Sequence, residues 1–407
     1  MSLLRDLRSS VNAVKPGRTT MRNYDLLLVV AVSALLLCGL IMVFSASIAL
    51  VDGPKYVNTS RYYFFIRHAV YIAVGLLFFG LTLMVPMSFW EKHAIGVFVV
   101  ALVMLVLVLV PFIGREVNGA HRWIPIGPVN FQPSEFMKVA MLLFAADYTV
   151  RKQKYMQHIW RGFGPMGLAL AMVGILLLLE PDLGAFMVTV AISVGILFLG
   201  GINLFLFVIV IILLALVISL LILLAPWRMA RITAYLNPFD ADNAQSSAYQ
   251  LVHSLIAIGR GEWFGVGLGF SVEKLHYLPE AHTDFIIAVI GEELGFVGIT
   301  AVVLLFFIIV KKCFEIGRSA IAMDREFSGL VAQGVGIWLG VQAFINLGVC
   351  LGLLPTKGLT LPLVSYGGSS IVMNLIALAI LLRIDFENRQ MMRGQHVNKE
   401  KKGLVNG

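Results

Sequence analysis

Charged residues are scarce in this 407-residue sequence. Asp, Glu, Lys and Arg make up 13% of it, whereas 59% of the residues are hydrophobic. A soluble globular domain carries about 25% charged residues, so an apolar excess on this scale needs lipid to cover it. The apolar runs are spread evenly along the chain, which predicts one membrane bundle rather than two or three soluble domains.

Cysteine and the common nucleotide and metal motifs are also lacking. The only cysteines are Cys38, Cys313 and Cys350, and their spacing argues against a disulfide framework or a metal site. The sequence contains neither a Gly-x-x-x-x-Gly-Lys-Ser/Thr phosphate loop nor a His-Glu-x-x-His pair, and the glycine cluster at 265–269 follows no predicted strand. We therefore expect no nucleotide cofactor and no nucleotide-driven chemistry.

Long apolar stretches are what the sequence does contain. A helix needs about 20 apolar residues to cross the bilayer core. Ten stretches are predicted to be spans: residues 24–50, 64–85, 93–113, 134–150, 163–179, 183–199, 202–224, 285–310, 328–353 and 367–384. The fifth and sixth are short and separated only by Glu180, Pro181 and Asp182, so they are either two helices or one broken helix.

The predicted fold is an all-α integral membrane bundle of about ten transmembrane helices. Residues 24–384 form the membrane domain, between cytoplasmic tails at 1–23 and 385–407. Of the 31 Lys and Arg residues, 20 lie in segments that a cytoplasmic N-terminus places inside and nine in outside loops, while Arg67 and Lys138 lie within spans. This bias predicts that both termini are cytoplasmic. It also explains the net charge of +8 without a nucleic-acid partner.

The outside connections hold most of the turn-forming and polar residues. The largest, at 225–284, joins helices 7 and 8 and includes a semi-apolar stretch at 249–258 that we expect to form an interfacial helix. Two further outside segments, 114–133 and 354–370, are rich in Gly, Pro and polar residues. Because long ordered loops are usually functional, chemistry or recognition is predicted on the outer face.

Some ionisable residues fall inside predicted spans. Burying one in the bilayer costs roughly 2.5–3.5 kcal/mol on insertion scales, which makes each a functional candidate. Glu135 and Lys138 stand at i and i+3 and can meet on one helix face, either as a structural ion pair or as the lining of a substrate cavity. Of Glu292 and Glu293, we expect one to face the bundle and the other to find a basic partner.

Asp284 lies where the largest outer loop enters the eighth span. One interpretation is that Thr283 or Asp284 is the N-cap of that helix, as Asp182 is predicted to be for the short sixth helix. The other is that Asp284 is a partly desolvated carboxylate with a raised pKa, suited to general-base catalysis. Glu280 and His282 are less favoured alternatives for that base.

Three outer cations, Arg67, Arg122 and Lys357, are of the type that binds phosphate, although each alone is more often a loop or interface anchor. An enzyme on the outer face cannot draw on nucleotide sugars, so its substrate must arrive already activated through the membrane. A lipid-linked diphosphate sugar fits this requirement. A carboxylate base and cations for the diphosphate leaving group are the minimum apparatus.

Several long motifs, in order along the chain, strongly resemble the SEDS family (shape, elongation, division and sporulation). They are Gln132-Pro133-Ser134-Glu135-Phe136-Met137-Lys138, Glu180-Pro181-Asp182-Leu183-Gly184, Leu278-Pro279-Glu280-Ala281-His282-Thr283-Asp284-Phe285, Gly291-Glu292-Glu293-Leu294-Gly295, and residues 355–362 with Ser365-Tyr366-Gly367-Gly368-Ser369-Ser370. The resemblance extends from residue 24 to about residue 389. Residues 254–262 and 277–282 resemble the division branch of the family rather than its elongation branch.

The resemblance implies a peptidoglycan glycosyltransferase that polymerises lipid II on the outer face of the bacterial cytoplasmic membrane, at the division septum. It implies a class B penicillin-binding protein as partner, which supplies the transpeptidase, and other membrane proteins of the division machinery. Asp284 matches the family's catalytic aspartate, and Glu135 and Lys138 match its cavity pair. A divalent cation, Mg²⁺ or Mn²⁺, is expected at the diphosphate by general metal chemistry, although no dedicated ligand set is visible.

On this basis one residue is assigned to catalysis and seven to substrate binding. The catalytic residue is Asp284, and the substrate-binding residues are Glu135, Lys138, Arg67, Arg122, Lys357, His282 and Ser369. Two alternatives remain open. A flippase for lipid II would suit the interrupted apolar stretch at Pro181, and a non-catalytic scaffold of the division machinery would make Asp284 dispensable.

Overall fold

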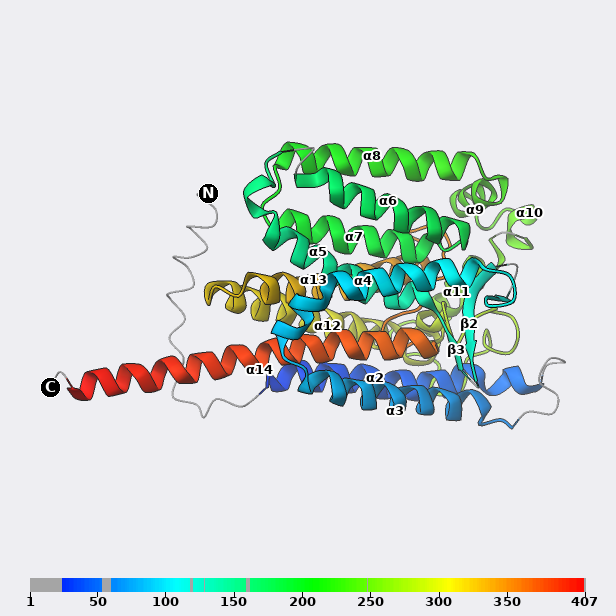
Figure 1. The fold of residues 1–407 in the computed structure, drawn as a ribbon. Coiled ribbons are helices and arrows are strands. Elements are labelled where there is room, and N and C mark those ends of the chain that lie inside the picture. Colours follow the sequence, from blue (N-terminus) through cyan, green and yellow to red (C-terminus); the bar gives the residue numbers. More distant parts are fainter. Residues whose placement is uncertain are drawn as a thin grey trace.

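The computed structural model describes residues 24–52, 60–117, 120–127, 129–158, 162–246 and 248–405. Within them, ten helices lie side by side as one bundle (Figure 1). These helices are α2 (Leu26–Ser47), α3 (Tyr63–Met84), α4 (Met87–Leu109), α5 (Pro133–Arg151), α6 (Gly164–Leu179), α7 (Leu183–Leu199), α8 (Leu204–Leu223), α12 (Ile286–Ala322), α13 (Glu326–Cys350) and α14 (Gly368–Val405).

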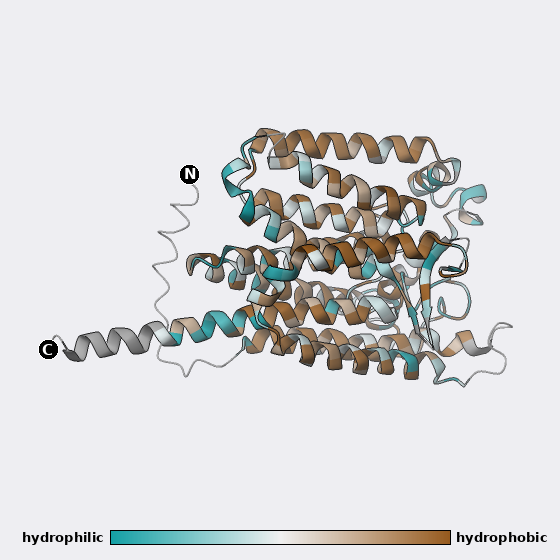
Figure 2. Cartoon of the chain, in the orientation of Figure 1, coloured by the Kyte–Doolittle hydropathy of each residue, from teal (hydrophilic) through white to brown (hydrophobic). Residues whose placement is uncertain are grey.

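Hydrophobic residues run along the full bundle, as Figure 2 shows. Among the described helices, α2, α3, α4, α8, α12, α13 and α14 are long and apolar enough to cross a bilayer. Helices α6 and α7 are apolar but have only 16 and 17 residues, and α5 carries four charged residues. The multi-pass helical fold is therefore confirmed, whereas the count of ten spans stays a prediction.

Helices α5, α13 and α14 lie at the centre of the bundle. The spans of α13 and α14 are 72% and 78% buried inside the protein, compared with 12% for α8, which stands at one edge of the bundle (Figure 1). Lys138 of α5 and Trp338 of α13 are among the largest fully buried side chains. The centre of the bundle is thus where a polar side chain is shielded most completely from lipid.

The two short apolar stretches form two helices, α6 and α7, joined by Glu180, Pro181 and Asp182. Asp182 caps α7, because its Oδ1 accepts a hydrogen bond from the Ala185 backbone N–H at 3.0 Å. The capping role predicted for Asp182 is confirmed. The tight turn places two acidic side chains, Glu180 and Asp182, at one end of the bundle.

The connection between α4 and α5 folds into a small antiparallel sheet, which the all-α prediction did not include. Its strands are β1 (Arg115–Val117), β2 (Ala120–Ile126) and β3 (Val129–Phe131), in the order β1-β2-β3. The short strands alternate too briefly to be recognised from sequence. The sheet matters because Arg122 is on β2.

The connection between α8 and α12 carries three helices, α9 (Pro226–Leu236), α10 (Ala241–Ala244) and α11 (Tyr249–Gly261). The helix predicted at 249–258 therefore forms, as α11. It packs against α12 and α13, and Ser254 Oγ donates a hydrogen bond to the Cys350 carbonyl at 2.8 Å. This contact ties the loop to the end of α13.

Helix α14 continues beyond its predicted end at residue 384, to Val405 (Figure 1). Two ion pairs at i, i+4 support the extension: Arg383 Nε lies 2.8 Å from Glu387 Oε1, and Arg389 Nε lies 2.9 Å from Asp385 Oδ1. Hydropathy located the end of the apolar run but not the end of the helix.

Candidate active site

Asp284 stands just before the first residue of α12, where α13 holds its backbone. The Asp284 carbonyl accepts a hydrogen bond from Asn346 Nδ2 at 2.7 Å, and the same nitrogen donates to the Leu359 carbonyl at 2.6 Å. A Cβ added at Gly358 would lie 2.9 Å from Asp284 Oδ2, so a glycine there makes room for the carboxyl group. The side-chain amide of Asn346 thus connects the Thr-Asp-Phe motif to the loop that follows α13.

The interpretation of Thr283 or Asp284 as an N-cap is wrong. Phe285 occupies the N-cap position of α12, and no side chain makes a cap hydrogen bond there. Thr283 Oγ1 donates instead to Glu280 Oε2 at 2.6 Å. The Asp284 carboxyl group is therefore not used for capping.

Burial raises the pKa of Asp284 to about 7. The nearby Glu280 and Asp182 carboxylates contribute to this rise in pKa, and the Arg122 guanidinium opposes it. Burial also lowers the pKa of His282, so its imidazole is neutral at physiological pH. A carboxyl group that titrates near neutrality can accept a proton from a substrate hydroxyl, which is the property expected of a general base.

Arg122 reaches from β2 to the turn between α6 and α7. Its Nε and Nη2 donate to the carbonyls of Glu180 and Pro181 at 2.9 and 2.5 Å. The Glu180 side chain beside it is fully buried. Burial and the nearby Asp182 carboxylate together raise the pKa of Glu180 to about 9, although the charge of Arg122 opposes this rise. A protonated Glu180 leaves the positive charge of Arg122 largely uncompensated by that carboxyl group.

Two arginines of α9, which were not identified as site residues from the sequence, join Lys357 and Arg122. Arg228, Arg231 and Tyr235 share one face of α9, and Tyr235 Oη donates to the Leu353 carbonyl in the loop that carries Lys357, at 3.0 Å. The i, i+3 spacing of Arg228 and Arg231 is the only feature of the sequence that could have indicated that both arginines belong to the site.

The pKa shifts of Lys357 and Arg231 agree with the placement of the α9 arginines beside Lys357 and Arg122. Burial and, to a smaller extent, the positive charges of Arg231 and Arg228 lower the pKa of Lys357 to about 8. Burial and the charge of Arg122 lower the pKa of Arg231. Four cations therefore lie at this end of the bundle as one group, here called the cation group: Arg122, Arg228, Arg231 and Lys357.

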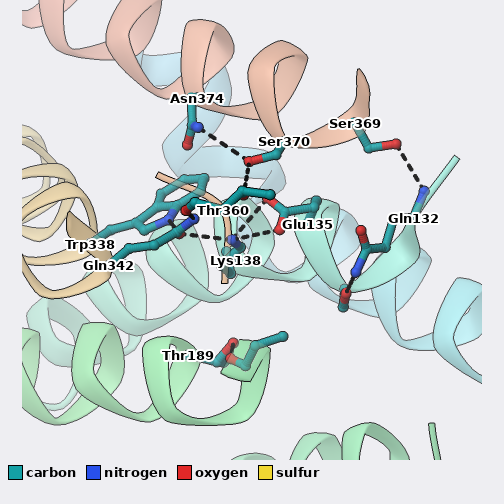
Figure 3. A network of polar contacts seen from close by, with 12 residues as sticks. Gln132, Glu135, Lys138, Thr189, Trp338, Gln342, Thr360, Ser369, Ser370 and Asn374 are labelled. Atoms are coloured by element: carbon teal, nitrogen blue, oxygen red, sulfur yellow. Dashed lines mark hydrogen bonds and ion pairs between the residues drawn. The ribbon is translucent and has the colours of Figure 1, made fainter. Parts of the chain in front are cut away.

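Glu135 and Lys138 form the predicted ion pair at the centre of a buried network (Figure 3). Lys138 Nζ lies 2.8 Å from both Glu135 carboxylate oxygens and donates to Gln342 Oε1 at 3.0 Å. The ammonium also stands 5.1 Å from the centre of the Trp338 ring. Gln342 Nε2 donates onward to the Thr360 carbonyl at 2.9 Å. The network therefore connects α5 and α13 to the loop before α14.

Ser369 connects the sheet to the start of α14. Its Oγ accepts a hydrogen bond from the Gln132 backbone N–H at 3.0 Å and donates to the Asn130 carbonyl at 3.2 Å; Figure 3 shows the first of these bonds. Both contacts are within the protein. The structure thus gives Ser369 a role in holding the outer segments together.

Arg67 and His282 belong to an aromatic group on the α3 side of the site. Arg67 Nη1 donates to Tyr63 Oη at 2.6 Å. The His282 ring lies 5.0 Å from Phe64 and 5.5 Å from Tyr366, centre to centre. The Tyr366 backbone N–H donates to the His282 carbonyl at 3.0 Å, which joins the last motif to the one that carries Asp284.

A resident metal does not fit the described residues. No group of three or more His, Cys, Asp and Glu side chains lies close enough together in them to hold an ion. Among the described carboxyl groups near Asp284, Glu280 accepts from Thr283, Asp182 caps α7, and Glu180 has a pKa raised to about 9. The expected Mg²⁺ or Mn²⁺ requirement stays a prediction.

These features define a class: polytopic helical membrane proteins with a partly buried carboxyl group and a group of cations at one end of the bundle. Within that class, the chain belongs to the FtsW/RodA/SpoVE family of cell cycle proteins, whose sequence model matches residues 25–390. The predicted family resemblance is confirmed.

Relatives and solved structures agree with this assignment. The chain is 59% identical to a probable peptidoglycan glycosyltransferase FtsW of Burkholderia thailandensis, covering 96% of this chain and 85% of the relative. It is 60% identical to the protein of the same name from Taylorella equigenitalis, covering 88% and 97%. It also resembles a chain solved in a study of how a peptidoglycan synthase complex coordinates polymerization and crosslinking (TM-score 0.73, 29% identity, 90% and 99% covered). The rod shape determining protein RodA of Thermus thermophilus is similar as well (TM-score 0.65, 28% identity, 90% and 97% covered).

Proposed function

We propose that this protein is a peptidoglycan glycosyltransferase that polymerises lipid II on the outer face of the cytoplasmic membrane during septal cell-wall synthesis. One observation carries the proposal: the Asp284 carboxyl group, with a pKa of about 7, stands at the same end of the bundle as the cation group. Close relatives bear the name of this activity. A base and an anion-binding group are what glycosyl transfer from a lipid diphosphate requires.

In the proposed reaction, Asp284 accepts the proton of the GlcNAc 4-hydroxyl group of an acceptor lipid II. The hydroxyl oxygen attacks the anomeric carbon of the MurNAc at the lipid-linked end of the growing glycan. The bond from that carbon to the diphosphate oxygen breaks, and the lipid diphosphate leaves with the electron pair. Attack opposite the leaving group inverts the anomeric configuration.

We assign the diphosphate to the cation group. Charge-assisted hydrogen bonds from guanidinium and ammonium groups stabilise phosphate oxygens strongly, most of all where water is partly excluded. Arg122 and Lys357 were predicted for this role, and Arg228 and Arg231 extend it. Because Lys138 is completely buried and paired, we propose that it supports the wall of the site together with Glu135 rather than binding substrate.

We further propose that a class B penicillin-binding protein works with this chain at the division septum, with both termini of the chain in the cytoplasm. The similar chain solved in a peptidoglycan synthase complex supports such a partner. The positive-inside pattern supports the orientation. Co-purification with the cognate transpeptidase, and protease access to tags on each terminus in inverted vesicles, test these two points.

Activity is expected to peak between about pH 7 and pH 8. The base must be ionised, so the rate rises with pH through the pKa of Asp284, about 7; the groups that face this carboxyl are Glu280, Asp182, Arg122 and Cys350. The rate falls as Lys357 loses its proton near pH 8. Initial rates of polymerisation from pH 5.5 to 9.5 test this profile. A Lys357→Met variant should lose the basic limb and keep the acidic one; the reverse result would contradict the assignments.

Arg231→Gln is expected to weaken the use of lipid II by about tenfold in kcat/KM, since a hydrogen bond to a charged group contributes about 1.5–3 kcal/mol. Titrating labelled lipid II against the initial rate measures the change. The matched control is Arg318→Gln. Arg318 is an exposed arginine of α12 and is distant in sequence from Asp284. Equal kcat/KM for the two variants would remove α9 from the diphosphate site.

The flippase and scaffold alternatives predict different results. A flippase would move labelled lipid II across vesicles of purified protein, with or without the Asp284 carboxylate. A scaffold would support division when Asp284 is replaced. Loss of polymer together with loss of division on replacing Asp284 favours the glycosyltransferase.

A further inference from the structure

Helix α12 is interrupted close to Asp284. Gly295 has φ 67° and ψ −164°, which are not helical values. Phe296 and Val297 N–H would normally bond the carbonyls of Glu292 and Glu293, four residues earlier. They donate instead to the carbonyls of Glu262 and Trp263, at 2.9 and 3.1 Å. The backbone ladder of α12 is therefore broken between its first nine residues, which follow Asp284, and the rest of the helix.

The outer loop fills the gap from the other side. The N–H groups of Val266 and Gly267 donate to the carbonyls of Glu292 and Glu293 at 2.9 and 3.1 Å. Glycine is needed for this approach, because a Cβ added at Gly265 would lie 2.2 Å from the Glu293 carbonyl oxygen. Gly265, the first glycine of the cluster at 265–269 that matched no nucleotide motif, thus has a packing function. The first part of α12 is bonded to the loop rather than to its own continuation.

Two buried acid groups strengthen this attachment. Glu293 Oε1 lies 2.6 Å from Lys274 Nζ and also accepts from Ser45 Oγ of α2 at 2.7 Å. Lys274 Nζ donates to the same Ser45 Oγ at 2.9 Å. Lys274 is 3% exposed and Glu293 is completely buried, so water does not compete for this pair.

Glu292 makes the parallel contact. Its Oε1 lies 2.7 Å from Arg260 Nη1 and accepts from the Val272 backbone N–H at 2.9 Å, and its Oε2 accepts from Ser271 Oγ. Both glutamates therefore have basic partners, whereas the sequence predicted one. The set Ser45, Arg260, Ser271, Lys274, Glu292 and Glu293 is here called the α12 clamp.

The ion pair between Lys274 and Glu293 joins the two ends of a short segment of chain that has Asp284 near its middle. Residues 275–283 connect Lys274 to Asp284, and residues 285–292 connect Asp284 to Glu293. We propose that Lys274 and Glu293 are positioning residues that fix the Asp284 carboxyl group for catalysis, because the interrupted helix cannot fix it alone. This inference rests on the proposed function.

A double variant, Lys274→Met/Glu293→Gln, is the test. Lys274→Met alone leaves a buried carboxylate unpaired and destabilises the fold, whereas the double variant removes both charges and keeps the side-chain volumes. The control is Asp385→Asn/Arg389→Gln, which removes a 2.9 Å ion pair at the other end of the bundle. Hydrogen–deuterium exchange of the segment 275–285 and the kinetics of lipid II polymerisation are measured for both.

The expected result for the double variant is exchange of segment 275–285 at least about tenfold faster, as local opening becomes easier. We also expect kcat lower by about tenfold with KM changed less than about twofold, because misplacement of a base affects the chemical step. The acidic limb of the pH profile should move to lower pH as Asp284 becomes more hydrated. The control should change none of these.

Unchanged exchange, kcat and pH profile in the folded double variant would overturn the proposal, as would a change in KM alone. The exchange measurement does not depend on activity. If the wild-type protein made no glycan but the double variant still exchanged faster in 275–285, the proposed function would fail while the clamp as a structural device would stand.

Discussion

Asp284→Asn should lower the rate of lipid II polymerisation by about 10³-fold, within the 10²–10⁴ range typical of a general base. Asparagine keeps the shape of the side chain and the backbone contacts to Asn346, but it cannot accept the proton of the sugar hydroxyl group. The affinity for lipid II should stay within about twofold, because Asp284 acts on the hydroxyl proton in the transition state. Initial rates and equilibrium binding of labelled lipid II measure the two effects.

The matched control is Glu280→Gln, four residues earlier on the same loop. Glu280 is exposed and accepts a hydrogen bond from Thr283, and it raises the pKa of Asp284. This variant should keep most of the activity, with the acidic limb of the pH profile displaced slightly to lower pH. A large loss in Glu280→Gln with near-normal turnover in Asp284→Asn would transfer the base to Glu280.

Lys138→Met should destabilise the folded protein by about 3–5 kcal/mol, because it leaves the buried Glu135 carboxylate without its cation. Glu135→Gln/Lys138→Met should recover most of this loss, since no buried charge is then unpaired. The change in stability is measured by heating the protein in detergent and determining the fraction that stays monodisperse at each temperature. Activity of the folded double variant should remain within about tenfold of the wild type.

A second ion pair on α5 provides the comparison. Arg151 Nη2 lies 2.6 Å from Asp147 Oδ2, but the Arg151 side chain is 47% exposed, so Arg151→Met should cost about 1 kcal/mol or less. If Lys138→Met were as stable as the wild type and had lost binding of lipid II instead, the pair would line the substrate cavity and the supporting role proposed here would be wrong.

The features that the sequence predicted correctly depend on local spacing. Glu135 and Lys138 pair because residues three apart share a helix face, and Asp182 caps α7 because it stands directly before an apolar run. Apolar length likewise located the helices. These relations hold within a few residues, so no knowledge of the rest of the fold is needed.

The features that the sequence did not predict depend on residues distant along the chain. Asp284 does not cap α12, because its carbonyl is held by Asn346 and its carboxyl group faces Gly358. Glu292 finds Arg260 only because α12 is interrupted and the loop enters the gap. Hydrophobic periodicity carries no information about such an interruption, since the residues on both sides of Gly295 continue an apolar helix.

The most direct test uses purified protein together with its cognate penicillin-binding protein, whose transpeptidase site is inactivated. Labelled lipid II is added with Mg²⁺ or Mn²⁺, and the glycan products are resolved on a gel. We expect long glycan strands from the wild-type protein, formed with release of lipid diphosphate, and none from Asp284→Ala. A folded, partner-bound wild-type protein that makes no polymer would contradict the proposed glycosyltransferase activity and favour the flippase or scaffold.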